Sequence, residues 1–216
     1  MRAPFVKVCG ITRAEDARIA VAAGARALGF VFVDDSPRCI APEDATVIVR
    51  SLPGDIAKVG VVRDLDLRTL KALVAGVGLT ALQLHGDEPP ELLEELSVPA
   101  IKAFAAGPGF QIERLVPYRD FGVLLDGGTA QGHGGTGTPA DWNAARTARE
   151  RGFRVLLAGG LGPVNVTQAV REVEPVAIDL NSGVESAPGR KDRELIERAI
   201  HGLSSFDPPE ISTWPW

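Results

Sequence analysis

The stretches FRVLLAGG at residues 153–160 and PVAIDLNSG at residues 175–183 indicate how this chain folds. In each of them a short apolar run ends in a turn that contains glycine. Such runs are typical of parallel strands that are buried on both faces. The same arrangement recurs along the chain, with an amphipathic segment between one apolar run and the next. The pattern therefore predicts successive βαβ units around a parallel sheet.

Eight such units favour a closed barrel, because an open doubly wound sheet more often has about five or six strands. The predicted strands are 5–9, 27–33, 56–62, 79–84, 99–104, 121–126, 153–158 and 175–180. The predicted helices are 13–23, 42–51, 66–75, 89–96, 139–151, 163–173 and 191–203, and the fifth crossover at 107–118 has the weakest helical pattern. We expect an α/β protein, a single-domain (β/α)8 TIM barrel over residues 1–203.

Helix starts and the C-terminal end have their own signals. Thr12, Pro42 and Pro163 stand where helices are expected to begin. Residues 204–216 read SSFDPPEISTWPW, and their prolines disfavour a helix. We expect this C-terminal tail to lie on the barrel surface with its tryptophans over apolar side chains, the alternative being a partner-binding motif.

The composition excludes several classes of function. The formal charge of −5 and the aromatic content of 6% argue against a nucleic acid or a membrane surface as partner. No apolar run approaches the ~20 residues that span a bilayer. The two cysteines, Cys9 and Cys39, have no metal-site spacing, and the chain enters a strand without a signal peptide. We expect a cytoplasmic protein, as a monomer or a homodimer.

A thiol and a carboxylate end two of the predicted strands. Alternation places Lys7 and Cys9 on the inner face of the first strand, and Asp126 closes the sixth strand. Residues at the carboxyl ends of barrel strands gather at one mouth, where active sites of this fold lie. Cys9 is a candidate base whose pKa the Lys7 ammonium would lower, and Asp126 is a candidate for acid–base chemistry. The alternatives are an inert core cysteine and an aspartate that caps the following glycine-rich loop.

The fourth strand brings polar groups to the same mouth. Gln83 and His85 share its inner face and could hydrogen-bond a sugar hydroxyl or orient a catalytic group. A histidine satisfied at the barrel mouth is the alternative. A metal site is not expected, because His133 and His201 fall in a loop and a helix.

Two adjacent turns predict a phosphate site. Gly159 and Gly160 follow the seventh strand, and Ser182 and Gly183 follow the eighth. Phosphate in barrels is commonly bound after these two strands, where glycine lets backbone N–H groups approach the anion. Gly135 and Gly137, in the glycine-rich stretch 127–138, could add a third wall.

Arg38 follows the second strand in the segment DDSPR. Its planar guanidinium could bind a carboxylate through two hydrogen bonds. The alternative is a surface arginine paired with Asp34 or Asp35.

These segments together resemble the phosphoribosylanthranilate isomerase family of tryptophan biosynthesis, over about residues 6 to 200. The matching strings are KVCGIT at 7–12, GFVF at 29–32 leading to SPR at 36–38, QLHG at 83–86, LLD at 124–126, GGTG at 134–137 with DW at 141–142, AGGL at 158–161, DLNSGVE at 179–185 and APGRKD at 187–192. Their order and spacing make the resemblance specific.

The resemblance implies an isomerase that carries out an Amadori rearrangement without a metal or organic cofactor. Its substrate would be the aminoaldose N-(5'-phosphoribosyl)anthranilate and its product an aminoketose. Asp126 would protonate the furanose oxygen and open the ring to a Schiff base, and Cys9 would remove the C2 proton. Arg38 would bind the anthranilate carboxylate, and Lys7, Gln83, His85 and Asp179 would belong to the substrate site.

Some positions depart from what the family often shows, and they concern substrate affinity. They are Thr138-Pro139, Ala158, Leu180-Asn181 and Cys39, the last expected near the anthranilate ring. Two other functions stay open at this point. One is another phosphosugar aldose–ketose isomerase of the barrel class, and the other is a catalytically silent barrel that binds phosphate.

Overall fold

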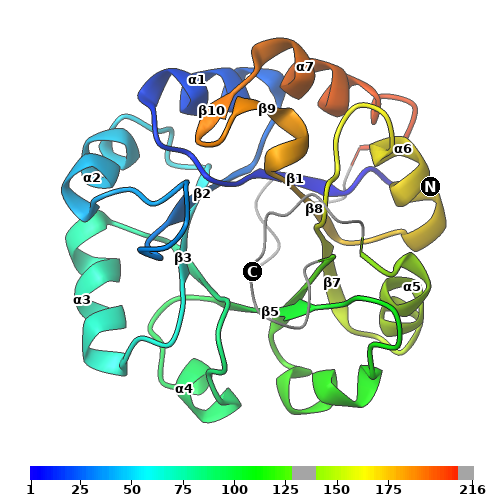
Figure 1. Cartoon of the computed structure of the whole chain (residues 1–216), viewed down its shortest axis with the longest axis horizontal. Coiled ribbons are helices and arrows are strands. Elements are labelled where there is room, and N and C mark those ends of the chain that lie inside the picture. The colour runs from blue at the N-terminus through cyan, green and yellow to red at the C-terminus, as the bar shows by residue number, and fades with distance from the viewer. Residues whose placement is uncertain (128–139, 209–216) are drawn as a thin grey trace.

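Eight parallel strands close into a barrel in the computed structural model, which describes residues 1–127 and 140–208 (Figure 1). The strands are β1 Phe5–Val8, β2 Ala27–Val31, β3 Ala57–Val62, β4 Ala81–Leu84, β5 Ala100–Ala105, β6 Gly122–Asp126, β7 Arg154–Leu157 and β8 Ala177–Leu180. Strand β1 pairs with both β2 and β8, which closes the ring. The predicted single-domain TIM barrel is confirmed.

Helices surround the barrel and cover its outer face (Figure 1). They are α1 Ala14–Ala23, α2 Pro42–Arg50, α3 Leu67–Val77, α4 Pro90–Glu94, α5 Trp142–Glu150, α6 Val166–Val173 and α7 Arg193–His201, with 3-10 helices η1 Ile112–Tyr118 and η2 Ser182–Val184. The fifth crossover, which had the weakest helical pattern, forms η1. Pro117 lies inside η1 and lacks the N–H that a regular α-helix needs.

Two of the three predicted helix starts are wrong. Helix α1 begins at Ala14, and Thr12 instead donates its hydroxyl to the Gly189 carbonyl at 2.6 Å. Helix α6 begins at Val166, so Pro163 lies in the turn before it. Pro42 does begin α2. Thr12 does not cap α1, because its hydroxyl bonds Gly189, a residue distant in the sequence.

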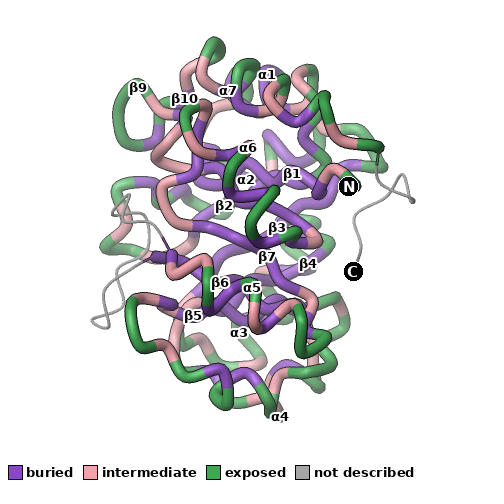
Figure 2. The backbone as a smooth tube through the Cα atoms, turned by 90° about the vertical axis from the view of Figure 1, so that its right-hand side faces the viewer, coloured by how far each residue is buried: buried purple, intermediate pink, exposed green. Residues whose placement is uncertain are grey.

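A two-stranded antiparallel hairpin follows β8, and the sequence did not predict it. Strands β9, Glu185–Ala187, and β10, Arg190–Lys191, are too short to show an alternating pattern. The hairpin lies on the side of the barrel away from the N-terminus (Figure 2). It therefore stands at the same end as the loops that follow the barrel strands.

The core has two layers that follow the predicted alternation. Phe5 belongs to the cluster inside the barrel, whereas Val6 and Val8 pack in the larger cluster between the barrel and the helices. Leu124 likewise faces inward, which puts Gly122 and Asp126 on the inner side of β6. Apolar side chains thus fill the barrel, and the polar residues at the strand ends lie above them.

Residues 204–208 of the C-terminal tail lie beside the N-terminus. The Asp207 carbonyl accepts from the Ala3 N–H at 2.6 Å, and the Asp207 N–H donates to Met1 at 3.1 Å. Trp214 and Trp216 lie outside the described residues, so their expected packing stays a prediction. No helix in the two described ranges is long and apolar enough to cross a membrane.

The loops after β7 and β8 touch through their backbones. A Cβ added at Gly162 would lie 2.6 Å from the Gly183 carbonyl oxygen, and a Cβ at Gly183 would collide with the Leu161 carbonyl. Neither position has room for a side chain. This contact fixes the two loops expected to bind phosphate against each other.

We expect Gly162→Ala to lower the free energy of unfolding by about 1–3 kcal/mol, because the added methyl must displace backbone. Thermal or denaturant unfolding would measure this. Gly76→Ala, in α3 with no atom within 4 Å of the new methyl, is the matched control and should stabilise the protein by up to about 1 kcal/mol. If Gly162→Ala and Gly76→Ala changed the free energy of unfolding equally, the close backbone contact between the two loops would not contribute to stability.

Candidate active site

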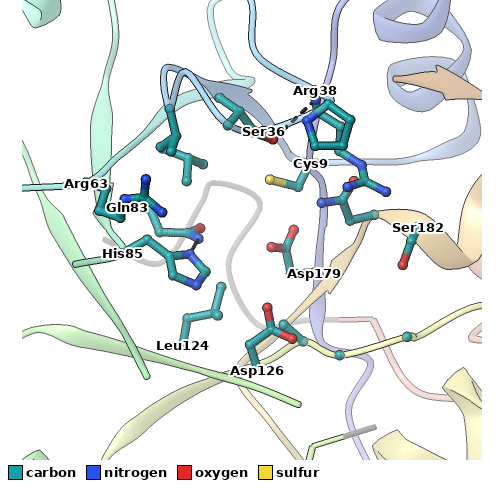
Figure 3. A pocket seen from close by; sticks show the side chains of 18 of the residues that line it. Cys9, Ser36, Arg38, Arg63, Gln83, His85, Leu124, Asp126, Asp179 and Ser182 are labelled. Carbon is teal, nitrogen blue, oxygen red and sulfur yellow. Dashed lines mark hydrogen bonds between the residues drawn. The ribbon is translucent and has the colours of Figure 1, made fainter. Parts of the chain in front are cut away.

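A cavity of about 260 Å³ opens at the carboxyl ends of the barrel strands (Figure 3). Residues of β2, β3, β4, β6 and β8 line it, together with residues that follow β1, β2, β3, β4, β7 and β8. The predicted site residues among them are Cys9, Arg38, Gln83, His85, Asp126, Gly159, Gly160, Asp179 and Ser182. The tertiary structure therefore brings together residues from both ends of the sequence.

Cys9 lies next to a buried ion pair between Lys7 and Asp179. Lys7 is fully buried, and its Nζ lies 2.9 Å from Asp179 Oδ2. Burial raises the pKa of the Cys9 thiol, Asp179 raises it further, and the opposing effects of Lys7 and Lys191 are smaller. Cys9 is therefore a thiol at neutral pH. Lys7 lowers the pKa of Cys9 as expected, but burial and Asp179 raise it by more.

Asp126 faces Cys9 from across the cavity (Figure 3). It ends β6 and is only 8% exposed, with Leu124 below it on the same face. The Asp126 carbonyl accepts from the Ala106 N–H at 2.7 Å, which fixes the backbone at the end of the strand. The thiol and the carboxyl group thus approach a bound molecule from two sides.

Gln83 and His85 complete the wall on the side of β4. The Gln83 amide nitrogen lies 3.3 Å from His85 Nδ1, so Nδ1 accepts and Nε2 carries the proton of the neutral ring. Burial, together with the Lys102 and Lys7 charges, lowers the pKa of His85 to about 4. His85 is therefore neutral at physiological pH and offers one N–H donor.

Arg38 is not a surface arginine paired with Asp34 or Asp35. It is 7% exposed, and its Nη2 lies 2.7 Å from Glu185 Oε2. Asp35 pairs instead with Arg63, at 2.8 Å. The alternative role that the sequence left open for Arg38 is thereby excluded.

Of the predicted phosphate residues, Gly159, Gly160 and Ser182 line the cavity. Gly183 is not among the lining residues and packs against Leu161 behind them. Gly135 and Gly137 lie outside the described residues. The loop after β7 is held by Asn165, whose side chain accepts from the Gly162 N–H at 2.9 Å and donates to the Gly160 carbonyl at 3.1 Å.

The two described ranges contain no group of three or more His, Cys, Asp and Glu side chains arranged to hold a metal ion. The polar groups of the cavity are a thiol, carboxyl groups, a neutral imidazole and guanidinium groups. Such a set can transfer protons and bind anions.

Comparison with known proteins identifies the family. The family described as N-(5'phosphoribosyl)anthranilate (PRA) isomerase matches residues 6–201. The chain belongs to this family. The phosphoribosylanthranilate isomerase of Trichlorobacter lovleyi is 45% identical over 202 residues, which are 92% of this chain and 98% of the relative. That of Geobacter metallireducens is 46% identical over 198 residues, with 90% and 98% covered.

Solved phosphoribosylanthranilate isomerases have the same fold. The enzyme of Thermotoga maritima is 40% identical and superposes with a TM-score of 0.87, with 94% of this chain and 99% of the other covered. An isomerase solved in complex with reduced 1-(o-carboxyphenylamino)-1-deoxyribulose 5-phosphate is 39% identical, with a TM-score of 0.84 and the same coverage. The family and the enzyme class that the sequence predicted are confirmed.

The positions that depart from the usual family residues fall in different places. Ala158 and Asn181 line the cavity, whereas Leu180 is buried in the outer core. Cys39 is exposed and is not a lining residue, so the expectation that it lies near the anthranilate ring is wrong. Thr138 and Pro139 lie outside the described residues.

Sequence reasoning missed several residues of the site. Asp35 and Arg63 line the cavity, and Glu185 holds Arg38 from outside it. Arg63 directly follows a predicted strand, which is a signal that could have been used. The position of Glu185 had no such signal, since it depends on the hairpin.

The raised pKa of Cys9 can be tested by alkylation. In a Cys39→Ser background only Cys9 reacts with iodoacetamide, and we expect its rate to rise with a midpoint above the ordinary thiol value of about 8.5. The measurement is the pseudo-first-order rate of alkylation between pH 6 and pH 10. A midpoint near or below neutral pH would show a preformed thiolate and contradict the effect of burial.

Proposed function

We propose that this chain converts N-(5'-phosphoribosyl)anthranilate into 1-(2-carboxyphenylamino)-1-deoxyribulose 5-phosphate, with Asp126 as acid and Cys9 as base. The observation that carries the proposal is the placement of these two groups on opposite sides of one cavity (Figure 3). Family membership supports the reaction. The residue roles follow from the geometry and from the chemistry that each step requires.

In the first step Asp126 gives a proton to the furanose oxygen. The bond between this oxygen and C1 breaks, and the electron pair on the anthranilate nitrogen forms the C=N bond of a protonated Schiff base. Asp126 is left as a carboxylate. Its place at the end of β6, directed into the cavity, lets it reach a ring oxygen without moving the backbone.

In the second step Cys9 takes the proton from C2. The electrons of the C–H bond form the enolamine and neutralise the iminium nitrogen. The raised pKa of Cys9 favours the thiol, but the cationic Schiff base brings a positive charge beside it, which favours release of the thiol proton to water and leaves the thiolate as the base. The base is thus activated when it is needed. The Cys9 thiol then returns the proton to C1, and the C2 hydroxyl loses its proton to water, which turns the enolamine into the aminoketone. A proton from water restores the Asp126 carboxyl group.

Two buried acceptors fit the sugar hydroxyls. Among the described residues, Gln83 Oε1 and Asp179 Oδ1 are buried without a hydrogen-bond partner, and both residues line the cavity. A buried acceptor that stays unpaired costs free energy, so a bound hydroxyl that donates to it is favoured. His85 supplies a donor nearby. Lys7, although expected to bind substrate, lies below the cavity and holds Asp179 in place.

The ends of the substrate carry its charges. Gly159, Gly160 and Ser182 would hold the phosphate, and Arg38 the anthranilate carboxylate. The apolar wall of Val31, Val61 and neighbouring Val33 suits the aromatic ring between them. Contacts at both ends act equally before and after proton transfer, so they position the reacting atoms between Asp126 and Cys9.

We take residues 1–203 as the catalytic unit, supported by the closed barrel, and a cytoplasmic location, supported by the free thiols of Cys9 and Cys39. Either a monomer or a homodimer fits, and the Thermotoga maritima relative is described as dimeric.

Cys9→Ala and Asp126→Asn should each lower turnover by the ~10²–10⁴ typical of one acid–base group. The assay generates phosphoribosylanthranilate in the cuvette and follows the decay of its fluorescence. Cys39→Ser is the control and should keep normal turnover, because that thiol is outside the cavity. Near-normal turnover by either site variant would remove its assigned role, and absence of decay with the unchanged protein would favour another aminoaldose phosphate or a silent binder.

Arg38→Ala should chiefly raise KM, because its pairing with the carboxylate is the same before and after the proton moves. The same assay, run over a range of substrate concentrations, separates KM from kcat. A large fall in kcat at unchanged KM would be incompatible with a carboxylate anchor.

A further inference from the structure

Among the described residues, Glu185 holds the guanidinium of Arg38 by one edge. Its Nε lies 3.0 Å from Glu185 Oε1, and its Nη2 lies 2.7 Å from Glu185 Oε2. These two nitrogens form one of the two edges through which an arginine grips a carboxylate. The other edge consists of Nη1 and the second N–H of Nη2, and among the described residues Nη1 has no hydrogen-bond partner. A ligand carboxylate would fit this edge.

Glu185 is itself fixed by the hairpin. Lys191 Nζ lies 2.8 Å from Glu185 Oε1, and the Gly189 N–H donates to the same oxygen at 3.2 Å. Lys191 Nζ also lies 2.9 Å from Asn181 Oδ1, in the loop after β8. Burial opposes the charge on Glu185, but the hydrogen bonds from Arg38 and Lys191 outweigh it and lower its pKa. Glu185 is therefore an anion with its carboxylate held from three sides.

The stem of Arg38 is also confined. A Cβ added at Gly10 would lie 2.7 Å from Arg38 Cδ and 2.8 Å from Asn181 Oδ1. Gly10 has a φ of +72°, a conformation that favours glycine. Its bare backbone lets the arginine pass beside β1 toward the hairpin. Because the stem of Arg38 and one edge of its guanidinium are both fixed, the edge that contains Nη1 has a fixed orientation.

The net charge of the cluster formed by Arg38, Lys191 and Glu185 is balanced by one anion. Arg38 and Lys191 are cationic and Glu185 is anionic, so the three buried side chains carry a net charge of +1. A single carboxylate neutralises it. Removal of Glu185 would leave two buried cations close together and free the arginine to turn, which changes both the charge and the direction of the site.

We propose that Glu185 is a positioning residue that sets the specificity of the site for a carboxylate on the aromatic ring. It acts through Arg38, whose guanidinium it holds by one edge so that the other edge meets the ligand. The inference rests on the proposed function in one respect, since it requires Arg38 to be the carboxylate anchor. It adds a residue on a late hairpin, outside the cavity wall, to the determinants of substrate choice.

The test is a double-mutant cycle of Glu185→Gln and Arg38→Ala. Glutamine keeps the shape, but whichever way its amide faces, a donor meets Arg38 or Lys191. We expect E185Q to raise KM for the anthranilate adduct of ribose 5-phosphate about tenfold with kcat changed less than about twofold, and to raise it no further when Arg38 is already alanine. The adduct of aniline, which lacks the carboxylate, should bind wild type and E185Q alike as substrate or competitor.

Two further variants keep the test decisive. Glu113→Gln removes an exposed ion pair in which Glu113 Oε1 lies 2.9 Å from Arg151 Nη1. This control variant should leave KM unchanged. Glu185→Asp keeps the charge but draws the carboxylate back from Arg38, so it should raise KM in the same direction even if E185Q folds poorly. Thermal unfolding of each variant shows that the native fold is present.

Each outcome decides between the two proposals. If R38A raises KM while E185Q and E185D leave it unchanged, Glu185 does not position the arginine and only this inference is overturned. An equal effect of E185Q with and without Arg38 would show that the hairpin supports the fold in general, which also overturns it. If R38A leaves KM unchanged, the anchor in the proposed function is wrong and this inference is overturned with it.

Discussion

The ion pair between Lys7 and Asp179 joins the first strand of the barrel to the last. The two residues are register partners across β1 and β8, and both are buried where the ring closes. Removing one partner of such a pair typically costs about 3–5 kcal/mol, because the other charge stays buried. The pair also sets the environment of Cys9, which stands two residues beyond Lys7 at the mouth. Closure of the fold and the state of the thiol therefore depend on the same two charges.

The charged groups of the site lie in two places, one around the reacting centre and one at the end that binds an anion. At the centre, a neutral thiol and a neutral imidazole line the cavity, and Lys7 compensates Asp179. At one end, Arg38 with Glu185 forms a cationic edge for an anion. Beside the reacting centre, Arg38 and Lys191 both pair with Glu185, and Arg63 pairs with Asp35. The substrate thus brings the charge that changes the protonation of the thiol, and the protein stays close to neutral where the reaction takes place.

The fold and most of the candidate site could be predicted from the sequence because they depend on local rules. Alternation along β1, β4 and β6 sufficed to direct Cys9, His85 and Asp126 inward. Lys7 lowers the pKa of Cys9 as predicted, but the sequence did not show that burial and Asp179, which is distant in the sequence, raise it by more. Thr12 failed as a helix cap for the same kind of reason, since Gly189 competes for its hydroxyl.

The sequence by itself determined the barrel, the family and the strand ends that carry the chemistry, because strand period and turn residues are properties of neighbouring positions. Only the tertiary structure decided which charges are paired. Arg38 meets Glu185 rather than Asp34 or Asp35, and Arg63 meets Asp35. The physical reason is that an ion pair depends on distance in space and on burial. For Arg38 both depend on the last hairpin, whose Glu185 meets the loop after the second strand.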